Sequence, residues 1–262
     1  MADLNNHTVV VTGGSTLIGH GVVRALRDCG ASVVIMDIDA AGAHPLVEEM
    51  PGRVSFEQTD VTSDGQIASA VVRVVEKFGG IDGLVNLACS YVDDGSASTR
   101  EQWHAALDVN LIGAAVVTQH VRPHLAASRR GAIVNVTSIS SKVAQTGRWV
   151  YPAGKAALVQ LTRSMAMDFA DEGIRVNSVS PGWTWSSVMA QATGGDRDKV
   201  DSVAAPFHLT RRAGDPAEVG AVAAFLLSSD ASGVTGADWA VDGGYSAMGP
   251  EQAVPAIAGL VE

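Results

Sequence analysis

Tyr151 and Lys155 have the spacing in this chain that points most directly to chemistry, in the segment Tyr151-Pro152-Ala153-Gly154-Lys155. Residues four apart share one face of a helix, so we expect the Lys155 ammonium beside the Tyr151 phenol. A free tyrosine has a pKa of about 10 and is a poor base near neutral pH, but a nearby cation stabilises the phenolate and lowers that pKa. Pro152 is compatible with the first helical turn, where its missing N–H is not needed. The pair therefore predicts proton transfer by Tyr151.

A glycine-rich turn near the start of the chain is suited to binding phosphate. It reads Thr12-Gly13-Gly14-Ser15-Thr16-Leu17-Ile18-Gly19-His20-Gly21 and separates an apolar run from a helical segment. Glycines there let the backbone approach a pyrophosphate, and the helix N-terminus supplies free N–H donors and the positive end of its dipole. We expect dinucleotide contacts from Gly13, Ser15, Ile18 and Gly19.

Asp37 ends the second apolar run, 24 residues after Gly13, and is followed by Ile38 and Asp39. An acid in this place accepts hydrogen bonds from both adenosine ribose hydroxyls and repels the 2′-phosphate of NADP. Residues 12–23 and 37–43 contain no Arg or Lys to bind such a phosphate. The alternative interpretation is that Asp37 caps the next helix. The sequence favours NAD, with Asp37 and Ile38 at its adenosine end.

A regular alternation of elements must position these residues. Short apolar or β-branched runs predict strands at 8–11, 32–36, 54–56, 83–86, 132–136 and 174–179. Helical spacing predicts helices at about 17–29, 41–50, 64–78, 99–127, 150–171 and 216–228. Apolar strands alternating with helices predict an α/β fold, a doubly wound parallel sheet with helices on both faces. No linker, charge block or repeat interrupts the pattern, so we expect a single domain over residues 1–262.

Two further features of the sequence follow the ends of predicted strands. Ser138 follows the fifth strand, which places it at the carboxyl edge of the sheet, where ligands bind in α/β proteins. The segment 183–214 joins a strand to a helix by far more than the usual two to six residues or so, and we expect it to be a functional lid.

Charge and cysteine content exclude several classes of protein. The chain has 18 Lys+Arg against 28 Asp+Glu, a formal net charge of −10, and no basic run longer than a pair, which argues against nucleic acid as a partner. Cys29 and Cys89 lie in no metal-ligand spacing, and we expect buried thiols and no metal site. With neither a signal sequence nor an apolar membrane span, the expected location is cytoplasmic.

Further motifs follow in a set order along the chain: Asp60-Val61, Asn86-Leu87-Ala88, Asn110, Ser138, Pro181-Gly182 and Asp242-Gly243-Gly244. Ser138 stands 13 residues before Tyr151. With the glycine loop and the Tyr151 and Lys155 pair, this ordered set resembles the short-chain dehydrogenase/reductase family over about residues 7–249. The resemblance implies a Rossmann fold.

The resemblance also implies an activity, the NAD-dependent oxidation of a secondary alcohol to a ketone, or of a sugar hemiacetal to a lactone. Tyr151 would be the general acid/base on the substrate oxygen, and Ser138 would hydrogen-bond the same oxygen. Lys155 would lower the pKa of Tyr151 and hold the nicotinamide ribose. Asn110 would anchor the water through which the proton passes to Lys155. Taken singly, Asn110 and Ser138 are equally well explained by backbone hydrogen bonds at the ends of elements.

Cofactor contacts are implied by the same resemblance. Asp60 and Val61 would contact the adenine ring, and Asn86 and Ala88 the adenosine ribose and nearby backbone. At the nicotinamide end the family pattern assigns Pro181, Gly182, Thr184 and Ser186, besides Tyr151 and Lys155. Three positions depart from the pattern, and one of them is Ser186, which keeps a hydroxyl where Thr is usual. Leu17 stands where Gly or Ala is usual, so either the loop widens or the leucine packs against the helix, and Leu87-Ala88-Cys89 replaces the usual Ala-Gly after Asn86.

Three tryptophans flank Tyr151 or begin the long loop, and we expect Trp149, Trp183 and Trp185, with Ser138 and Tyr151, to bind substrate. Their flat faces suit a sugar ring or an aromatic alcohol, while Gln145, Arg148 and His208 would supply polar or anionic recognition. The alternative is that these tryptophans seal the loop against the core. The sequence favours a hydroxylated or aromatic alcohol as substrate.

Two other functions stay open. A 3-oxoacyl-thioester (acyl carrier protein) reductase would share the catalytic residues, but it would normally use NADPH and a basic docking surface, which Asp37 and the acidic balance disfavour. A non-catalytic NAD-binding regulatory protein is disfavoured by intact Ser138, Tyr151 and Lys155. The resemblance further implies a homotetramer, or a dimer, with the last strand near 239–244 in an interface and the tail 250–262 reaching a neighbouring subunit.

Overall fold

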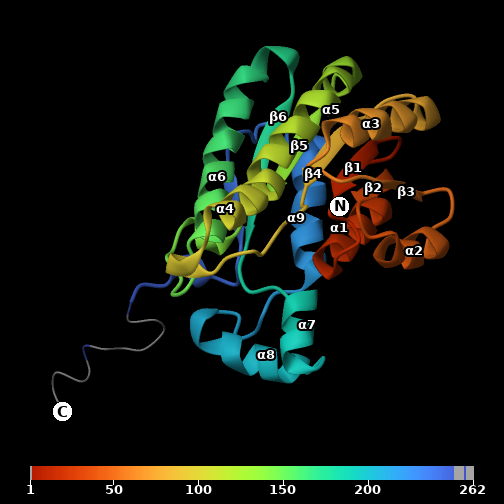
Figure 1. Ribbon diagram of the computed structural model, residues 1–262. Coiled ribbons are helices and arrows are strands. Elements are labelled where there is room, and N and C mark those ends of the chain that lie inside the picture. Colours follow the sequence, from red (N-terminus) through yellow and green to blue (C-terminus); the bar gives the residue numbers. More distant parts are fainter. Residues whose placement is uncertain (1, 251–256, 258–262) are drawn as a thin grey trace.

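Seven strands lie side by side in one parallel sheet, in the order β3-β2-β1-β4-β5-β6-β7 (Figure 1). The computed structural model describes residues 2–250 and residue 257, so most of the tail 250–262 lies outside the described residues. The strands are β1 (Thr8–Thr12), β2 (Ser32–Asp37), β3 (Val54–Gln58), β4 (Gly83–Asn86), β5 (Ala132–Val136), β6 (Arg175–Pro181) and β7 (Asp238–Val241). The predicted fold class, a doubly wound parallel α/β sheet, is confirmed.

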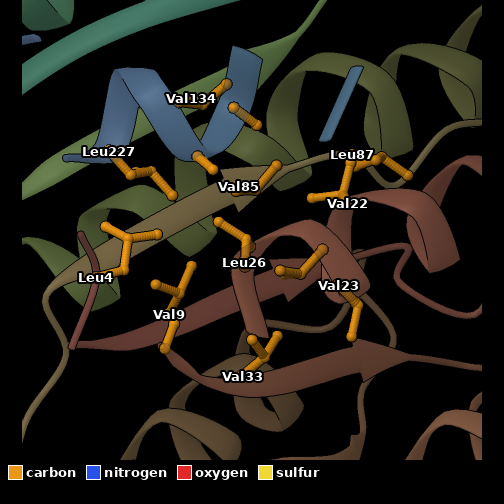
Figure 2. Close-up of a cluster of buried hydrophobic side chains, with 14 of the residues drawn as sticks. Leu4, Val9, Val22, Val23, Leu26, Val33, Val85, Leu87, Val134 and Leu227 are labelled. Atoms are coloured by element: carbon orange, nitrogen blue, oxygen red, sulfur yellow. The ribbon is translucent and has the colours of Figure 1, made fainter. Parts of the chain in front are cut away.

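Helices cover both faces of this sheet, because alternate strand residues point to opposite sides. Val9, Val33 and Val85 pack on one face with α1 (Leu17–Asp28), α2 (Ala40–Glu49) and α9 (Pro216–Leu227), and Figure 2 shows part of this core. Val10 and Val34 pack on the other face with α3 (Asp64–Phe78), α5 (Ala114–Ser128) and α6 (Val150–Asp168). The central strands β1, β4 and β5 are therefore buried on both sides, whereas the edge strand β7 is partly exposed.

The predicted helix 99–127 is interrupted. It consists of α4 (Arg100–Leu107), a π-helical segment Asp108–Gly113 and α5. The Asn110 side chain bonds both backbone groups of Ser90: its Oδ1 accepts the N–H at 2.6 Å, and its Nδ2 donates to the carbonyl at 2.8 Å. Single π-helical turns within longer helices are rare and are often found at functional sites. Hydrophobic periodicity alone does not reveal such a change of winding.

The long segment 183–214 has structure of its own. It contains α7 (Ser187–Thr193) and α8 (Arg197–Ala204), which project beyond one end of the sheet (Figure 1). Gly214 joins the start of the segment to its end, because its N–H donates to the Trp183 carbonyl at 2.7 Å and its carbonyl accepts the Trp185 N–H at 3.0 Å. The segment is a closed helical excursion. Across residues 2–250 and 257, no helix is both long and apolar enough to cross a membrane.

The strand order reverses between β1 and β4, because the chain builds β2 and β3 on one side and β5 to β7 on the other. Loops that leave neighbouring strands in opposite directions open a crevice at the carboxyl edge of the sheet. The glycine loop follows β1, and Ser138 follows β5. The topology therefore brings both to one edge.

Candidate active site

The glycine loop makes a tight approach to the turn after β4. Gly13 has a φ of +70°, and a Cβ at this position would lie 2.7 Å from the Ala88 nitrogen. Thr16 caps α1 by accepting the Gly19 N–H at 3.0 Å. The Ser15 hydroxyl is buried and has no hydrogen-bond partner among the described residues. A buried polar atom without a partner at a helix N-terminus is suited to an anionic ligand.

Asp37 lies beside the glycine loop, and its carboxylate is hydrogen-bonded to the backbone of that loop. Its Oδ2 accepts the Ser15 N–H and its Oδ1 accepts the Asp39 N–H, both at 3.0 Å. The cap of α2 is Asp39, which accepts the Gly42 N–H at 3.1 Å. The alternative interpretation of Asp37 as the helix cap is therefore wrong. Its neighbour Ile38 is 67% exposed at the carboxyl end of β2.

One cavity of about 870 Å³ extends from the glycine loop to the start of the 183–214 segment. The predicted residues that line it are Ile18, Ser138, Gln145, Arg148, Tyr151, Lys155, Pro181, Gly182, Trp183, Thr184 and Ser186. Leu17, the departure in the glycine loop, also lines the cavity and is half-buried there. The structure thus brings the two chemically distinct motifs of the sequence into one space.

Tyr151 lies at the centre of a group of hydroxyls. Its phenol lies near the hydroxyls of Ser138 and Tyr91, and the Tyr91 ring stacks on its own at 5.2 Å between centroids. The Ser138 hydroxyl donates to Ser140 Oγ at 3.2 Å, and Ser140 donates to Gln145 Oε1 at 2.9 Å. Tyr151 and Ser138 are therefore aimed at one point in the cavity.

Burial raises the pKa of Tyr151 above its ordinary value, and the nearby Cys89 thiol adds to the rise. The hydroxyls of Ser138 and Tyr91 and the charge of Arg148 oppose it without reversing it. Lys155 Nζ donates to the Val136 carbonyl at 2.7 Å and lies 5.7 Å from the Tyr151 ring centroid. The lowered pKa that we expected from Lys155 is therefore not found in this structure, because desolvation of the phenol outweighs the cations around it.

Asp93 holds the start of α6 from a separate loop. Its Oδ1 accepts the Trp149 N–H at 3.0 Å and its Oδ2 accepts the Tyr151 N–H at 2.9 Å. Burial alone would raise the pKa of Asp93, but these backbone donors, with those of Gly95 and Val150, lower it below its usual value. The carboxylate replaces the side-chain cap that α6 lacks at Trp149. It thereby places Tyr151 in the cavity.

Several predicted residues do not line the cavity, namely Gly13, Ser15, Gly19, Asp37, Ile38, Asp60, Val61, Asn86, Ala88, Asn110, Trp149, Trp185 and His208. Asn86 Nδ2 donates to Asn135 at 2.9 Å and to Thr118 at 3.1 Å, which directs its side chain into the protein. Asp60 Oδ1 accepts the Thr62 hydroxyl at 2.7 Å. Asn110 is buried against Ser90. In this structure the side chains of Asn86, Asp60 and Asn110 form hydrogen bonds within the protein and do not line the cavity.

The three tryptophans lie in different surroundings. Trp183 lines the cavity, Trp185 packs with Val200 and Met189 on the helices of the 183–214 segment, and Trp149 is 57% exposed. His208 is buried, with Nε2 accepting the Trp183 N–H at 3.2 Å and Nδ1 donating to the Ala204 carbonyl at 3.0 Å. Both ring nitrogens are therefore engaged within the fold.

The residues of the cavity wall that sequence reasoning missed include Tyr91, Asp93, Ser140, Phe207 and Tyr245. Tyr91 and Asp93 follow the carboxyl end of β4, an edge position that signals proximity to ligand. The Phe207 and Tyr245 rings pack together, with 6.0 Å between their centroids. Neither residue is part of a motif that would have predicted its place in the cavity wall. Cys29 and Cys89 are free and partly exposed rather than buried. Among the described residues, no cluster of His, Cys, Asp and Glu side chains is arranged to hold a metal ion.

Comparison with known proteins assigns the family. A family model described as "Enoyl-(Acyl carrier protein) reductase" matches residues 15–246. The chain belongs to the short-chain dehydrogenase/reductase family. It is therefore an oxidoreductase that uses a nicotinamide cofactor and acts on CH–OH groups.

Individual relatives are similar over almost their whole length. The chain is 38% identical over 246 residues to cis-4-hydroxycyclohexanecarboxylate dehydrogenase of Sinomonas cyclohexanicum, covering 91% of this chain and 96% of that protein. It is 36% identical over 243 residues to L-fucose dehydrogenase of Rattus norvegicus, covering 90% and 88%. The solved aldohexose dehydrogenase of Thermoplasma acidophilum superimposes with a TM-score of 0.86 at 28% identity, covering 95% and 97%.

Proposed function

We propose that this protein is an NAD-dependent dehydrogenase that oxidises a secondary alcohol on a ring, or a sugar hemiacetal, with Tyr151 as the general base. The observation that carries the proposal is the placement of Ser138, Tyr151 and Lys155 in the same cavity as the glycine loop. The alicyclic and sugar substrates named for the relatives support this substrate class.

The residues of the cavity fit a dinucleotide. The unpartnered Ser15 hydroxyl and the first turn of α1 would hold the pyrophosphate, and Asp37 the adenosine ribose. Pro181, Gly182, Thr184 and Ser186 would lie at the nicotinamide end, and Asp60, Val61, Asn86 and Ala88 would contact the adenosine half, the last two through their backbone. A nicotinamide ring held there would supply the hydride acceptor needed to oxidise the substrate carbon.

The chain itself positions the alcohol and removes its proton. Ser138 and Tyr151 line the same part of the cavity, and the Ser138 hydroxyl is close enough to lower the pKa of the phenol, so one substrate hydroxyl can contact both. Oxidation requires the phenolate form of Tyr151 to accept the hydroxyl proton, and reduction requires the phenol to return it. Lys155 would bind the nicotinamide ribose and pass the proton on through a water held near Asn110. The aromatic wall of Trp183 and Phe207 would exclude bulk water.

The preference for NAD rests on Asp37. Its carboxylate lies next to the Ser15 N–H at the end of β2, where the 2′-phosphate of NADP would meet a negative charge. We expect kcat/KM for NAD to exceed that for NADP by at least about a hundredfold, because like charges in contact cost several kcal/mol. Asp37→Ala should shrink this ratio mainly by improving NADP. An unchanged ratio would contradict the role of Asp37.

The decisive test of the activity is a substrate panel read by NADH absorbance, with alicyclic alcohols, polyols, aldoses and a 3-hydroxyacyl thioester. Turnover of the thioester alone would favour the acyl carrier protein reductase that the family model's description names. Binding of NAD without turnover of any alcohol would favour the regulatory protein. Tyr151→Phe should abolish turnover and leave the Kd for NAD nearly unchanged, since only the reacting hydroxyl is removed.

Assembly and location are part of the same proposal. We propose a homotetramer in the cytoplasm, acting on a small molecule and not on nucleic acid. The acidic balance of −10 and the two free cysteines support this setting. The exposed Trp239 on the edge strand β7 supports an interface there, since large apolar edge residues are commonly covered by another subunit.

A further inference from the structure

The Arg148 guanidinium faces the cavity without a partner. It lies 4.8 Å from the Tyr151 ring centroid and 5.9 Å from that of Tyr91. Over residues 2–250 and 257, no salt bridge or hydrogen bond joins its guanidinium to any carboxylate, carbonyl or hydroxyl. Three other half-buried arginines, Arg122, Arg197 and Arg212, pair with acids, and Arg175 donates to backbone carbonyls. A half-buried cation aimed into a cavity without a counter-ion is a candidate for binding an anion.

The chain holds Arg148 in this position. Gly147 has a φ of +76° and its carbonyl packs against Gly95, while the Arg148 N–H donates to the Gln145 carbonyl at 3.2 Å. Asp93 fixes the next residue, Trp149, through its N–H. The turn is therefore anchored at both ends, and the arginine projects from it over the two stacked tyrosines.

Gln145 adds a second donor at the same wall. Its Oε1 is occupied by the Ser140 hydroxyl, which leaves the two Nε2 hydrogens without a partner among the described residues. Within residues 2–250 and 257, Asp93 alone brings a carboxylate to the cavity wall, and backbone N–H groups bond both of its oxygens. The local field next to Tyr151 is therefore positive, and the free polar groups there are donors.

We infer that Arg148 and Gln145 form a subsite for a carboxylate carried by the substrate, so that the enzyme selects hydroxy acids on a ring over the corresponding neutral alcohols. This inference rests on the proposed function and names its substrate class. A planar carboxylate matches the guanidinium fork, and one arginine balances its single charge, whereas a phosphate dianion would require more cations. With the carboxylate on Arg148, the carbinol group lies toward Tyr151 and Ser138, the next polar groups along the wall.

Binding of a ligand that cannot react tests the subsite without turnover. We would titrate cyclohexanecarboxylate and cyclohexanecarboxamide calorimetrically into the full-length protein, with and without NAD. The carboxylate should bind more tightly than the amide. Arg148→Gln should weaken carboxylate binding roughly tenfold to a hundredfold, as expected for a charge-assisted pair. Arg148→Lys should restore part of the loss, and Arg163→Gln, an exposed arginine on α6, should cause none.

Kinetics give the second readout. For 4-hydroxycyclohexanecarboxylate and its carboxamide, the ratio of the kcat/KM values should favour the acid in the wild type and fall in Arg148→Gln, mainly through KM. Equal binding of acid and amide, or a ratio that Arg148→Gln leaves unchanged, would overturn the inference, as would tighter binding of cyclohexyl phosphate. Carboxylate binding without turnover of any alcohol would instead contradict the proposed dehydrogenase activity and leave the carboxylate subsite standing. The subsite and the activity therefore fail through different results.

Discussion

At the scale of single residues, the environment of Tyr151 departs from a simple tyrosine and lysine pair. Burial raises its pKa, while Arg148 and the hydroxyls of Ser138 and Tyr91 oppose that rise. Lys155 donates to the Val136 carbonyl and lies 5.7 Å from the centre of the Tyr151 ring. The pKa of the Tyr151 phenol therefore depends on several residues besides Lys155, which is the one that the sequence motif names.

Removing the charge of Arg148 should change the pH dependence of oxidation. In the proposed mechanism the phenolate is the reactive form, so kcat/KM should rise as pH passes the pKa of Tyr151. Because the Arg148 cation lowers that pKa, Arg148→Gln should move the rising limb to higher pH, and Arg148→Lys should move it less. Profiles measured with a neutral alcohol by NADH absorbance test this. An unmoved limb in Arg148→Gln would show that the arginine has no electrostatic effect on the base.

Tyr91 should assist Tyr151 through its hydroxyl. Tyr91→Phe keeps the stacked ring but removes the hydroxyl that helps to lower the pKa of Tyr151, so we expect kcat to fall roughly threefold to tenfold, the usual worth of one hydrogen bond. The Kd for NAD should not change, because Tyr91 lies at the substrate end of the cavity. Tyr91→Leu, which also removes the stacking, should lose more activity. Equal rates for wild type and Tyr91→Phe would assign Tyr91 to packing alone.

At the scale of elements, Asp93 connects the loop after β4 with the start of α6. Loss of its carboxylate leaves helix N–H groups without an acceptor, so Asp93→Ala should lower the free energy of unfolding by about 1–2 kcal/mol at pH 7. The folded-state pKa is lowered, so this contribution is complete above the ordinary Asp value of about 3.9 and disappears as pH falls through the folded-state value.

Denaturant unfolding at several pH values measures this contribution. The difference between wild type and Asp93→Ala should be constant near neutrality and shrink in acid. Asp94→Ala serves as the matched control, since the Asp94 side chain caps nothing. A difference that persists at low pH would show that the aspartate acts by packing and not by charge.

Local patterns predicted the strands β1 to β6 and the two main motifs, whereas β7 was expected only from the family resemblance and α7 and α8 were not predicted. Strand and helix periodicity anticipated the sheet, and the i, i+4 spacing anticipated the pair Tyr151 and Lys155 on α6. Contacts between distant segments were not predictable, because neither residue of such a contact has a pattern around it. Asp93 reaches Tyr151 across 58 positions, and Tyr91 stacks on it from the same loop. The π-helical segment and the burial of Asn86 likewise depend on tertiary partners.

At the scale of the whole molecule, a set of stabilising hydrogen bonds and the candidate active site lie at opposite ends of the strands. Arg175, at the amino end of β6, donates to the carbonyls of Leu226 at 2.7 Å and Ser228 at 3.0 Å, which close the end of α9. Desolvation lowers the pKa of this buried guanidinium. Arg175→Met should lower the free energy of unfolding by about 2–4 kcal/mol, because it leaves buried carbonyls unpaired.

The same variant should retain its catalytic constants at a temperature where it is folded. Steady-state assays and thermal unfolding of wild type and Arg175→Met would test this separation. A large change in KM for NAD together with the loss of stability would show that the two ends are coupled through the strands.

Assembly is a further property of the whole molecule. We expect light scattering coupled to size-exclusion chromatography to give the mass of a tetramer, four times 27.0 kDa. Trp239→Glu should shift this mass toward smaller species, because it places a charge on the edge strand. A monomeric wild-type protein would contradict the proposed interface.

The bonds of Asp93 have a consequence for changing the specificity of this enzyme. One carboxylate holds both the turn that presents Arg148 and the helix turn that presents Tyr151. Substrate choice and proton transfer therefore share a mechanical support. A library that varies the length or path of residues 145–149 would disturb the base along with the pocket. Exchanging side chains on the intact turn is the route that alters selectivity while preserving the rate.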